Sequence, residues 1–265
     1  MMILLLNSKK KFTVPLIIAL AILVGCGSTF VYKQNMKKPL PSKVHVIYHD
    51  LSGEITESEN RRIYDKDGVE KEIVYNEDGV KTERDYTKKE KRGKYELTSK
   101  GENDVITTVL TKDLTLISSE LKQKNDDYEL TETWRFKDGY PAQGKVFINY
   151  ADKTELESKT TKYEYSFSGD DNDKTCIVTI NENGEISKWQ YDYNSAGHIK
   201  KRIGKYESYS YEYVNGKNDL LTKIVEYNDE DGSLVKEVMF EYGDTKVSRA
   251  KYENYMKRWT CNGLE

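Results

Sequence analysis

Apolar side chains recur at every second position over long stretches of this chain. Tyr209, Tyr211 and Tyr213 alternate with Ser210 and Glu212. The same alternation is present at residues 163–167, 189–193 and 238–242. A period of two places alternate side chains on opposite faces of a strand, one buried and one in water. Such strands pair antiparallel, because parallel strands are buried on both faces.

Glycine-bearing turns separate these runs. Residues 64–68 read Tyr-Asp-Lys-Asp-Gly, residues 75–79 read Tyr-Asn-Glu-Asp-Gly, and residues 193–197 read Tyr-Asn-Ser-Ala-Gly. Asp, Asn and Gly supply the positive φ that tight hairpin turns need. The intervals between turns are irregular, which argues against a solenoid of fixed period. The sequence predicts an all-β fold: an antiparallel meander of repeated hairpins in a twisted open sheet, with a short helix near residues 253–259.

The N-terminus has the order of an export signal. Three lysines at residues 9–11 precede an apolar run of 13 residues, 12–24. A transmembrane helix needs about 20 apolar residues, whereas the apolar part of an export signal has about 7–15. Leu23, Val24 and Gly25 then precede Cys26, and this pattern resembles the bacterial lipobox. The resemblance implies cleavage after Gly25 and a lipid on Cys26; the alternative is an uncleaved signal anchor.

This signal sets the expected domain boundaries. Residues 1–25 form a lipoprotein signal peptide, residues 26–43 a lipidated flexible tether, and residues 44–265 a β-rich, repeat-like domain outside the cytoplasm. The expected location is the bacterial cell envelope, with the protein anchored to the membrane through the lipid on Cys26.

The net charge of the chain limits the class of partner that it can bind. Without residues 1–25 the chain has 39 Lys and Arg against 45 Asp and Glu, a net charge of −6. A net-acidic chain of mixed charge argues against nucleic acid as a partner. A glycan or another envelope protein remains as the expected partner.

Two further cysteines, Cys176 and Cys261, are left once Cys26 carries lipid. An even number in an exported protein allows a disulfide between them. The other interpretation is two free thiols, because Cys176 lies in the apolar run 176–180 and has the character of a core residue.

The turns resemble those of known repeats. An aromatic residue, then Asp or Asn, two residues and Gly, followed by charged and β-branched residues, is similar to YD-type (Rhs-like) repeats and to variant MORN-like repeats. The similarity covers residues 63–86 and 180–242, without the regular spacing of the YD pattern. It implies a β-rich extracellular scaffold and no particular activity.

Catalytic and metal-binding patterns are missing from the sequence. None of the three histidines, His45, His49 and His198, stands in a recognisable pairing with a nucleophile. A calcium loop counted from Asp65 has its glycine at the fourth position and fails the EF-hand spacing. We therefore expect no enzyme, no cofactor and no metal.

Carbohydrate binding is the more specific hypothesis. Trp189, Tyr191 and Tyr193 share one strand face and are candidates for stacking on a ligand ring; the competing interpretation is that they form the core. The first functional hypothesis is thus a lipid-anchored, non-catalytic envelope binding or interaction module. The alternatives are an accessory or protective factor that pairs with another protein through an exposed sheet edge, and an envelope hydrolase.

Overall fold

The structure is a computed structural model that describes residues 37–50, 52–77, 79–151, 157–170 and 174–260. Its strands are β1 (Lys37–His49), β2 (Ile55–Tyr64), β3 (Glu70–Glu77), β4 (Val80–Asp85), β5 (Thr87–Lys91), β6 (Lys94–Lys100), β7 (Asp104–Thr111), β8 (Leu116–Lys124), β9 (Tyr128–Lys137), β10 (Tyr140–Tyr150), β11 (Glu157–Ser168), β12 (Thr175–Glu182), β13 (Glu185–Tyr193), β14 (Ile199–Ile203), β15 (Ser208–Asn215), β16 (Leu221–Asn228) and β17 (Leu234–Ser248). A 3-10 turn, η1 (Lys217–Asp219), and one helix, α2 (Arg249–Thr260), complete the described elements. No helix among these residues combines the length and apolar character needed to cross a membrane.

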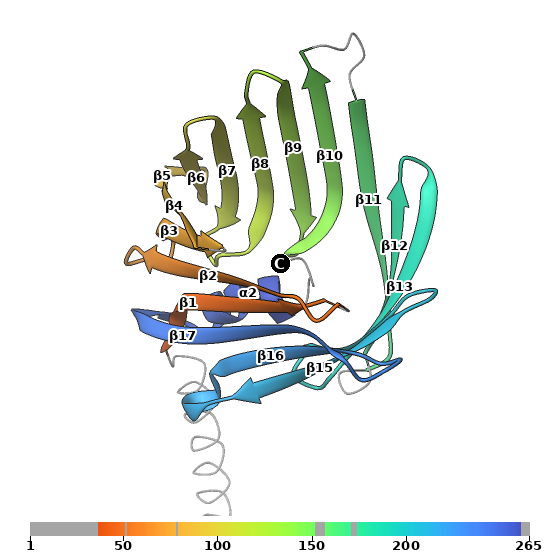
Figure 1. Ribbon diagram of the computed structural model, residues 1–265. Coiled ribbons are helices and arrows are strands. Elements are labelled where there is room, and N and C mark those ends of the chain that lie inside the picture. The colour runs from red at the N-terminus through yellow and green to blue at the C-terminus, as the bar shows by residue number, and fades with distance from the viewer. Residues whose placement is uncertain (1–36, 51, 78, 152–156, 171–173, 261–265) are drawn as a thin grey trace, which may run out of the picture.

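The 17 described strands belong to one antiparallel sheet in which, except for β4 and β5, neighbours in the chain pair with each other. β1 pairs with β2 on one side and with β17 on the other, so the two ends of the meander meet. Figure 1 shows the strands curling around a central space. The all-β prediction is confirmed, but the open sheet was wrong: the sheet is nearly closed and barrel-like. Twist accumulated over this many strands brings the first strand to the last, and their pairing removes two free edges.

Closure is interrupted at one seam. β4 pairs with β3, and β5 pairs with β6, while Tyr86 between them bends the chain. No backbone ladder joins the described strands β4 and β5. Side chains bridge this seam. Arg84 donates to Asp104 of β7, with Nη1 to Oδ1 at 2.9 Å, and the Lys88 ammonium contacts Asp65 and Asp67 of the β2–β3 turn. The seam is thus held by ion pairs among half-buried groups.

Helix α2 lies inside the curled sheet, behind β1 and β17 in Figure 1. Tyr252, Tyr255, Met256 and Trp259 are buried in one cluster with side chains of β1, β6, β7, β16 and β17. The Trp259 ring meets Phe240 edge to face at 5.6 Å, a geometry that aromatic pairs prefer. The short helix expected near residues 253–259 is present and longer, because its apolar face fills the interior.

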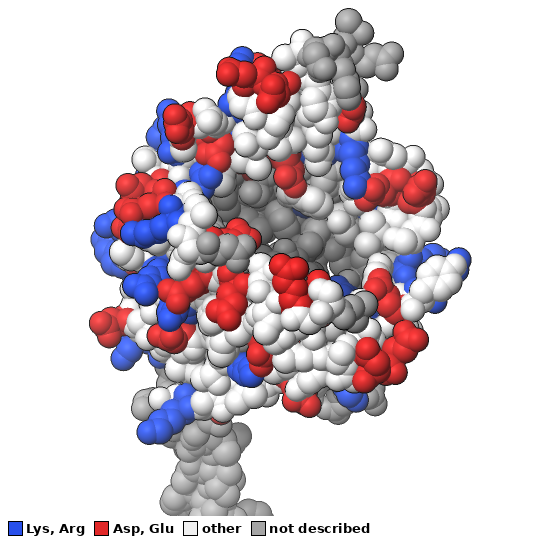
Figure 2. All heavy atoms as spheres, viewed as in Figure 1, with Lys and Arg blue, Asp and Glu red and all other residues white. Residues whose placement is uncertain are grey.

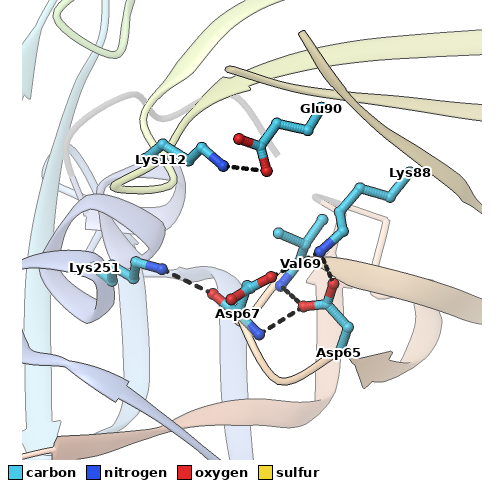
Figure 3. A network of polar contacts seen from close by, with 7 residues as sticks. All are labelled: Asp65, Asp67, Val69, Lys88, Glu90, Lys112 and Lys251. Carbon is cyan, nitrogen blue, oxygen red and sulfur yellow. Dashed lines mark hydrogen bonds and ion pairs between the residues drawn. The ribbon is translucent and has the colours of Figure 1, made fainter. Parts of the chain in front are cut away.

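Two turns hold this helix by polar contacts. Lys251 Nζ donates to the Asp67 carbonyl oxygen at 3.1 Å, and Asn254 Nδ2 donates to the Asp113 carbonyl oxygen at 3.1 Å. Figure 3 shows Lys88 and Lys251 reaching the same β2–β3 turn from the sheet and from α2. The turn therefore ties the seam to the helix.

A buried polar network lies beneath α2. Arg62 Nη1 donates to Glu70 Oε1 at 2.6 Å and to the Tyr255 hydroxyl at 3.2 Å. The Tyr255 and Tyr64 hydroxyls are 2.9 Å apart, and Tyr64 donates to the Pro41 carbonyl oxygen at 2.6 Å. Burial first of all raises the pKa of Tyr64 well above its ordinary value, so its hydroxyl stays protonated and able to donate. The network fixes β1, β2, β3 and α2 relative to each other.

The first strand begins earlier than expected. β1 starts at Lys37 and therefore includes residues 37–43, which we expected to belong to the tether. Leu40 has no exposed surface, and Pro41 is among the fully buried side chains. β1 shifts register against β17 on both sides of Pro41. Such irregularities are where a strand accommodates proline, which has no N–H for the ladder.

Candidate ligand-binding site

A cavity of about 580 Å³ opens between α2 and the turns that follow β13 and β15. We call it the end pocket. The residues that line it are Lys38, Tyr140, Lys174, Ser195, Ala196, Gly197, His198, Asn215, Asp219, Leu221, Arg249, Tyr252, Glu253, Met256, Lys257 and Thr260. Its volume falls in the range of small-molecule sites, about 300–1,000 Å³. It lies at the end of the sheet where β17 passes into α2.

A second cavity, the rim groove, lies at the opposite end of β6–β9. It has a volume of about 540 Å³ and is lined by residues 100–105, 122–124 and 129–131. Figure 2 shows acidic and basic residues interspersed over the face that is seen in Figure 1.

The turn between β13 and β14 forms one wall of the end pocket. Asn194 Oδ1 accepts from the backbone N–H groups of Ala196 and His198, at 3.0 and 3.1 Å. Gly197 adopts φ of 77° and donates its N–H to the Asn194 carbonyl oxygen. Asp65 organises residues 65–69 by the same bonds. The turn type predicted from the sequence is confirmed at both places, since the Asn or Asp side chain supports the turn.

His198 is held by this turn against Tyr213. The two ring centroids are 4.7 Å apart, and Tyr213 donates its hydroxyl to the Ile199 carbonyl oxygen at 2.6 Å. Burial lowers the pKa of His198 below its ordinary value, so the imidazole is neutral at pH 7.

This shift predicts a pH dependence of stability. In the unfolded chain His198 has a pKa of about 6.5, so as the pH falls through that value the unfolded state takes up its proton first. The free energy of unfolding therefore decreases between pH 7.5 and pH 5.5. Urea unfolding at both pH values should give a smaller decrease for His198→Asn than for the wild type; equal decreases would contradict the assignment.

Cations outnumber anions in the end pocket, with Lys38, Lys174, Arg249 and Lys257 against Asp219 and Glu253. Arg249 is satisfied within the protein, since its Nε donates to Glu253 Oε1 at 2.6 Å. Lys38 is buried, and its ammonium donates to the Asn218 carbonyl oxygen. Lys174 and Lys257 have no carboxylate partner among the described residues. Counted over the described residues, the pocket therefore carries an excess of positive charge.

The β10–β12 side of the end pocket is aromatic. The Tyr140 ring lies 5.5 Å from Tyr165 and 6.0 Å from Phe167. Lys174 Nζ lies 4.4 Å from the centroid of the Phe167 ring. Phe167 is 43% exposed, which is high for a large apolar side chain. Positive charge and an exposed aromatic surface therefore adjoin each other at the pocket.

None of the three stacking candidates from the sequence lines this pocket, although the Tyr193 ring adjoins it, 5.8 Å from Lys174 Nζ. Tyr193 is buried at 5% exposure in a cluster with Cys176, Val178 and Ile199. Trp189 and Tyr191 are half-buried on the same strand face. The Trp189 ring packs against Gly204, and the Arg202 guanidinium lies 5.0 Å from its centroid. Tyr193 thus belongs to the core; ring stacking by Trp189 and Tyr191 stays a prediction.

Of the three cysteines, Cys176 lies among the described residues. Cys176 is fully buried, and burial raises the pKa of its thiol. Cys261 and Cys26 lie outside the described residues, so the disulfide and the lipidation stay predictions.

Sequence reasoning missed the residues that line the end pocket. Lys38, Lys174 and Lys257 come from β1, the start of β12 and α2, far apart in the chain. No motif connects them, because only closure of the sheet around α2 brings them together. The turn at residues 194–197 is the part of the pocket wall that the sequence did predict.

Comparisons with known proteins give little more. No family model and no curated protein matches the chain. A solved structure that it is similar to is a porin-like protein from Bacteroides uniformis ATCC 8492, at 10% sequence identity and a TM-score of 0.48. The similarity covers 78% of this chain and 99% of that one.

Proposed function

We propose that this protein is a lipid-anchored, non-catalytic binding protein of the bacterial envelope that holds a small ligand in the end pocket. The observation that carries the binding role is the pocket itself, in which charged and polar side chains converge beside Tyr140, Leu221, Tyr252 and Met256. Its volume is that of a small-molecule site. The envelope location rests on the signal-like residues 9–26 of the sequence.

The nearly closed sheet favours a ligand inside the molecule over a partner strand at its edge. Among the described strands, only β4 and β5 have a single ladder partner. All five residues of β5 are exposed, and three of them are lysines. Charged edges of this kind discourage pairing with another chain. The accessory role through a sheet edge is therefore the weaker candidate.

A neutral fluorescent probe tests the binding role. Nile red should bind the wild type with one saturable site, seen as increased fluorescence. Ala196→Trp places a bulky ring in the pocket wall and should weaken this binding about tenfold or more, since it occupies the ligand volume. Ala151→Trp, in an exposed turn after β10, is the matched control and should bind as the wild type does. No saturable binding, or equal loss in both variants, would reject the pocket.

The anchor has its own expected result. Cys26→Ser removes the thiol that a lipid needs, so the protein should leave the membrane fraction and incorporate no labelled fatty acid. Cys176→Ser is the control and should remain in the membrane fraction with its label. If Cys26→Ser stays membrane-bound, the lipid anchor is wrong.

A further inference from the structure

We propose that the ligand of the end pocket is a single-chain amphiphile with an anionic head group, such as a fatty acid or an alkyl phosphate. This inference rests on the proposed binding role and specifies the ligand class. Three features carry it: two lysines without a carboxylate partner among the described residues, the aromatic side chains beside Lys174, and Tyr252 and Met256, which line the pocket from α2.

The head group is assigned to Lys174 and Lys257. Both line the end pocket, one from the sheet and one from α2. The pocket's two carboxylates lie toward Arg249: Glu253 is hydrogen-bonded to it, and Asp219 acts on it electrostatically. An anion between Lys174 and Lys257 would supply the negatively charged partner that neither ammonium group has among the described residues. Charge-assisted hydrogen bonds of this kind are about twice as strong as neutral ones.

Lys38 has a different role, as a positioning residue. Its ammonium is already bound to the carbonyl oxygens of Asn218 and Asp219, the latter at 3.5 Å. It therefore holds the β15–β16 connection, where Asn218 and Asp219 both have positive φ, against the start of β1. The pocket wall at Asp219 and Leu221 depends on that contact.

The apolar chain is assigned to the surface between the two walls. Tyr140 lines the pocket and packs against Tyr165 and Phe167, while Tyr252 and Met256 line it from α2. Phe167 does not line the pocket, but its ring contacts both Lys174 and Tyr140, which do. Methionine and aromatic side chains adapt to a flexible chain better than to a rigid polar ring.

A neutral polar ligand such as a sugar fits this surface less well. It would leave the ammonium groups of Lys174 and Lys257 without an anion. An anionic amphiphile satisfies both parts of the pocket together.

Displacement of Nile red tests the ligand class with a matched pair of probes. Dodecanoate and dodecanol share their chain, and only dodecanoate has a charged head group. Dodecanoate should therefore displace the dye at a concentration at least tenfold lower than dodecanol. Lys174→Gln and Lys257→Gln should each weaken the binding of dodecanoate about tenfold and leave the binding of dodecanol unchanged. Lys200→Gln removes the same charge from an exposed position of β14 and should change neither.

The outcomes separate the two proposals. If dodecanoate and dodecanol displace Nile red equally, and the lysine variants do not differ from the wild type, the anionic class is overturned while the binding role stands. If Nile red itself does not bind, the binding role falls and the ligand class falls with it. Dodecyl phosphate identifies the head: tighter binding than dodecanoate supports a phosphate, and weaker binding supports a carboxylate.

Discussion

Tyr255→Ala is expected to lower the free energy of unfolding by about 3–5 kcal/mol, the range for removing a large aromatic side chain from a core. Tyr255 is 1% exposed and stands at the centre of the contact between α2 and the sheet. Its ring meets Tyr64 edge to face at 5.9 Å. Chemical denaturation followed by tryptophan fluorescence measures the loss.

Tyr255→Phe is the control that separates ring from hydroxyl. It keeps the packed ring and removes the hydroxyl that accepts from Arg62 at 3.2 Å and lies 2.9 Å from the Tyr64 hydroxyl. The expected loss is about 1–3 kcal/mol, the cost of leaving buried partners without a hydrogen bond. A Tyr255→Ala loss below about 1 kcal/mol would mean that α2 does not pack inside the sheet.

Arg62→Met is the second change with a large expected effect. The replacement keeps an unbranched apolar stem and removes the guanidinium, leaving the carboxylate of Glu70, itself 8% exposed, without its cation. Breaking a buried ion pair from one side costs about 3–5 kcal/mol. The deficit relative to the wild type should shrink at acid pH, because protonation of Glu70 removes the uncompensated charge.

The double variant Arg62→Met, Glu70→Gln distinguishes this cause from a packing defect. It removes both charges, so it should be more stable than Arg62→Met alone at pH 7. Denaturation of the two variants in parallel supplies the comparison. If the double variant is the less stable of the two, the loss comes from packing and not from the stranded carboxylate.

Alternation and turn chemistry made the strands predictable. Residues 189–193 and 209–213 lie in strands β13 and β15, as their alternation in the sequence predicted. Asp65 and Asn194 direct the turns after β2 and β13. These are local properties of a few neighbouring residues. Closure is not local, since it depends on β1 pairing with β17, as in Val44 opposite Phe240. No short-range pattern encodes a contact across that separation, and we expected an open sheet.

The end pocket was unpredictable for the same reason. Lys174 belongs to no motif in the sequence, and Lys257 lies in a helix that we placed without a packing partner. Each is one of many lysines in the sequence. Their distinction is that closure around α2 brings them to one cavity without carboxylate partners among the described residues. Trp189, by contrast, was conspicuous in the sequence and packs against Gly204 and Arg202.

The central claim is that a ligand enters this sheet at the end where α2 begins. Amide chemical shifts of the labelled protein during titration with dodecanoate test it directly. The account predicts shifts at Ala196, Gly197 and Asn215 of the end pocket, and unchanged amides at Gly101 and Asn103 of the rim groove. Shifts confined to the rim groove, or no saturable shifts at all, would contradict it.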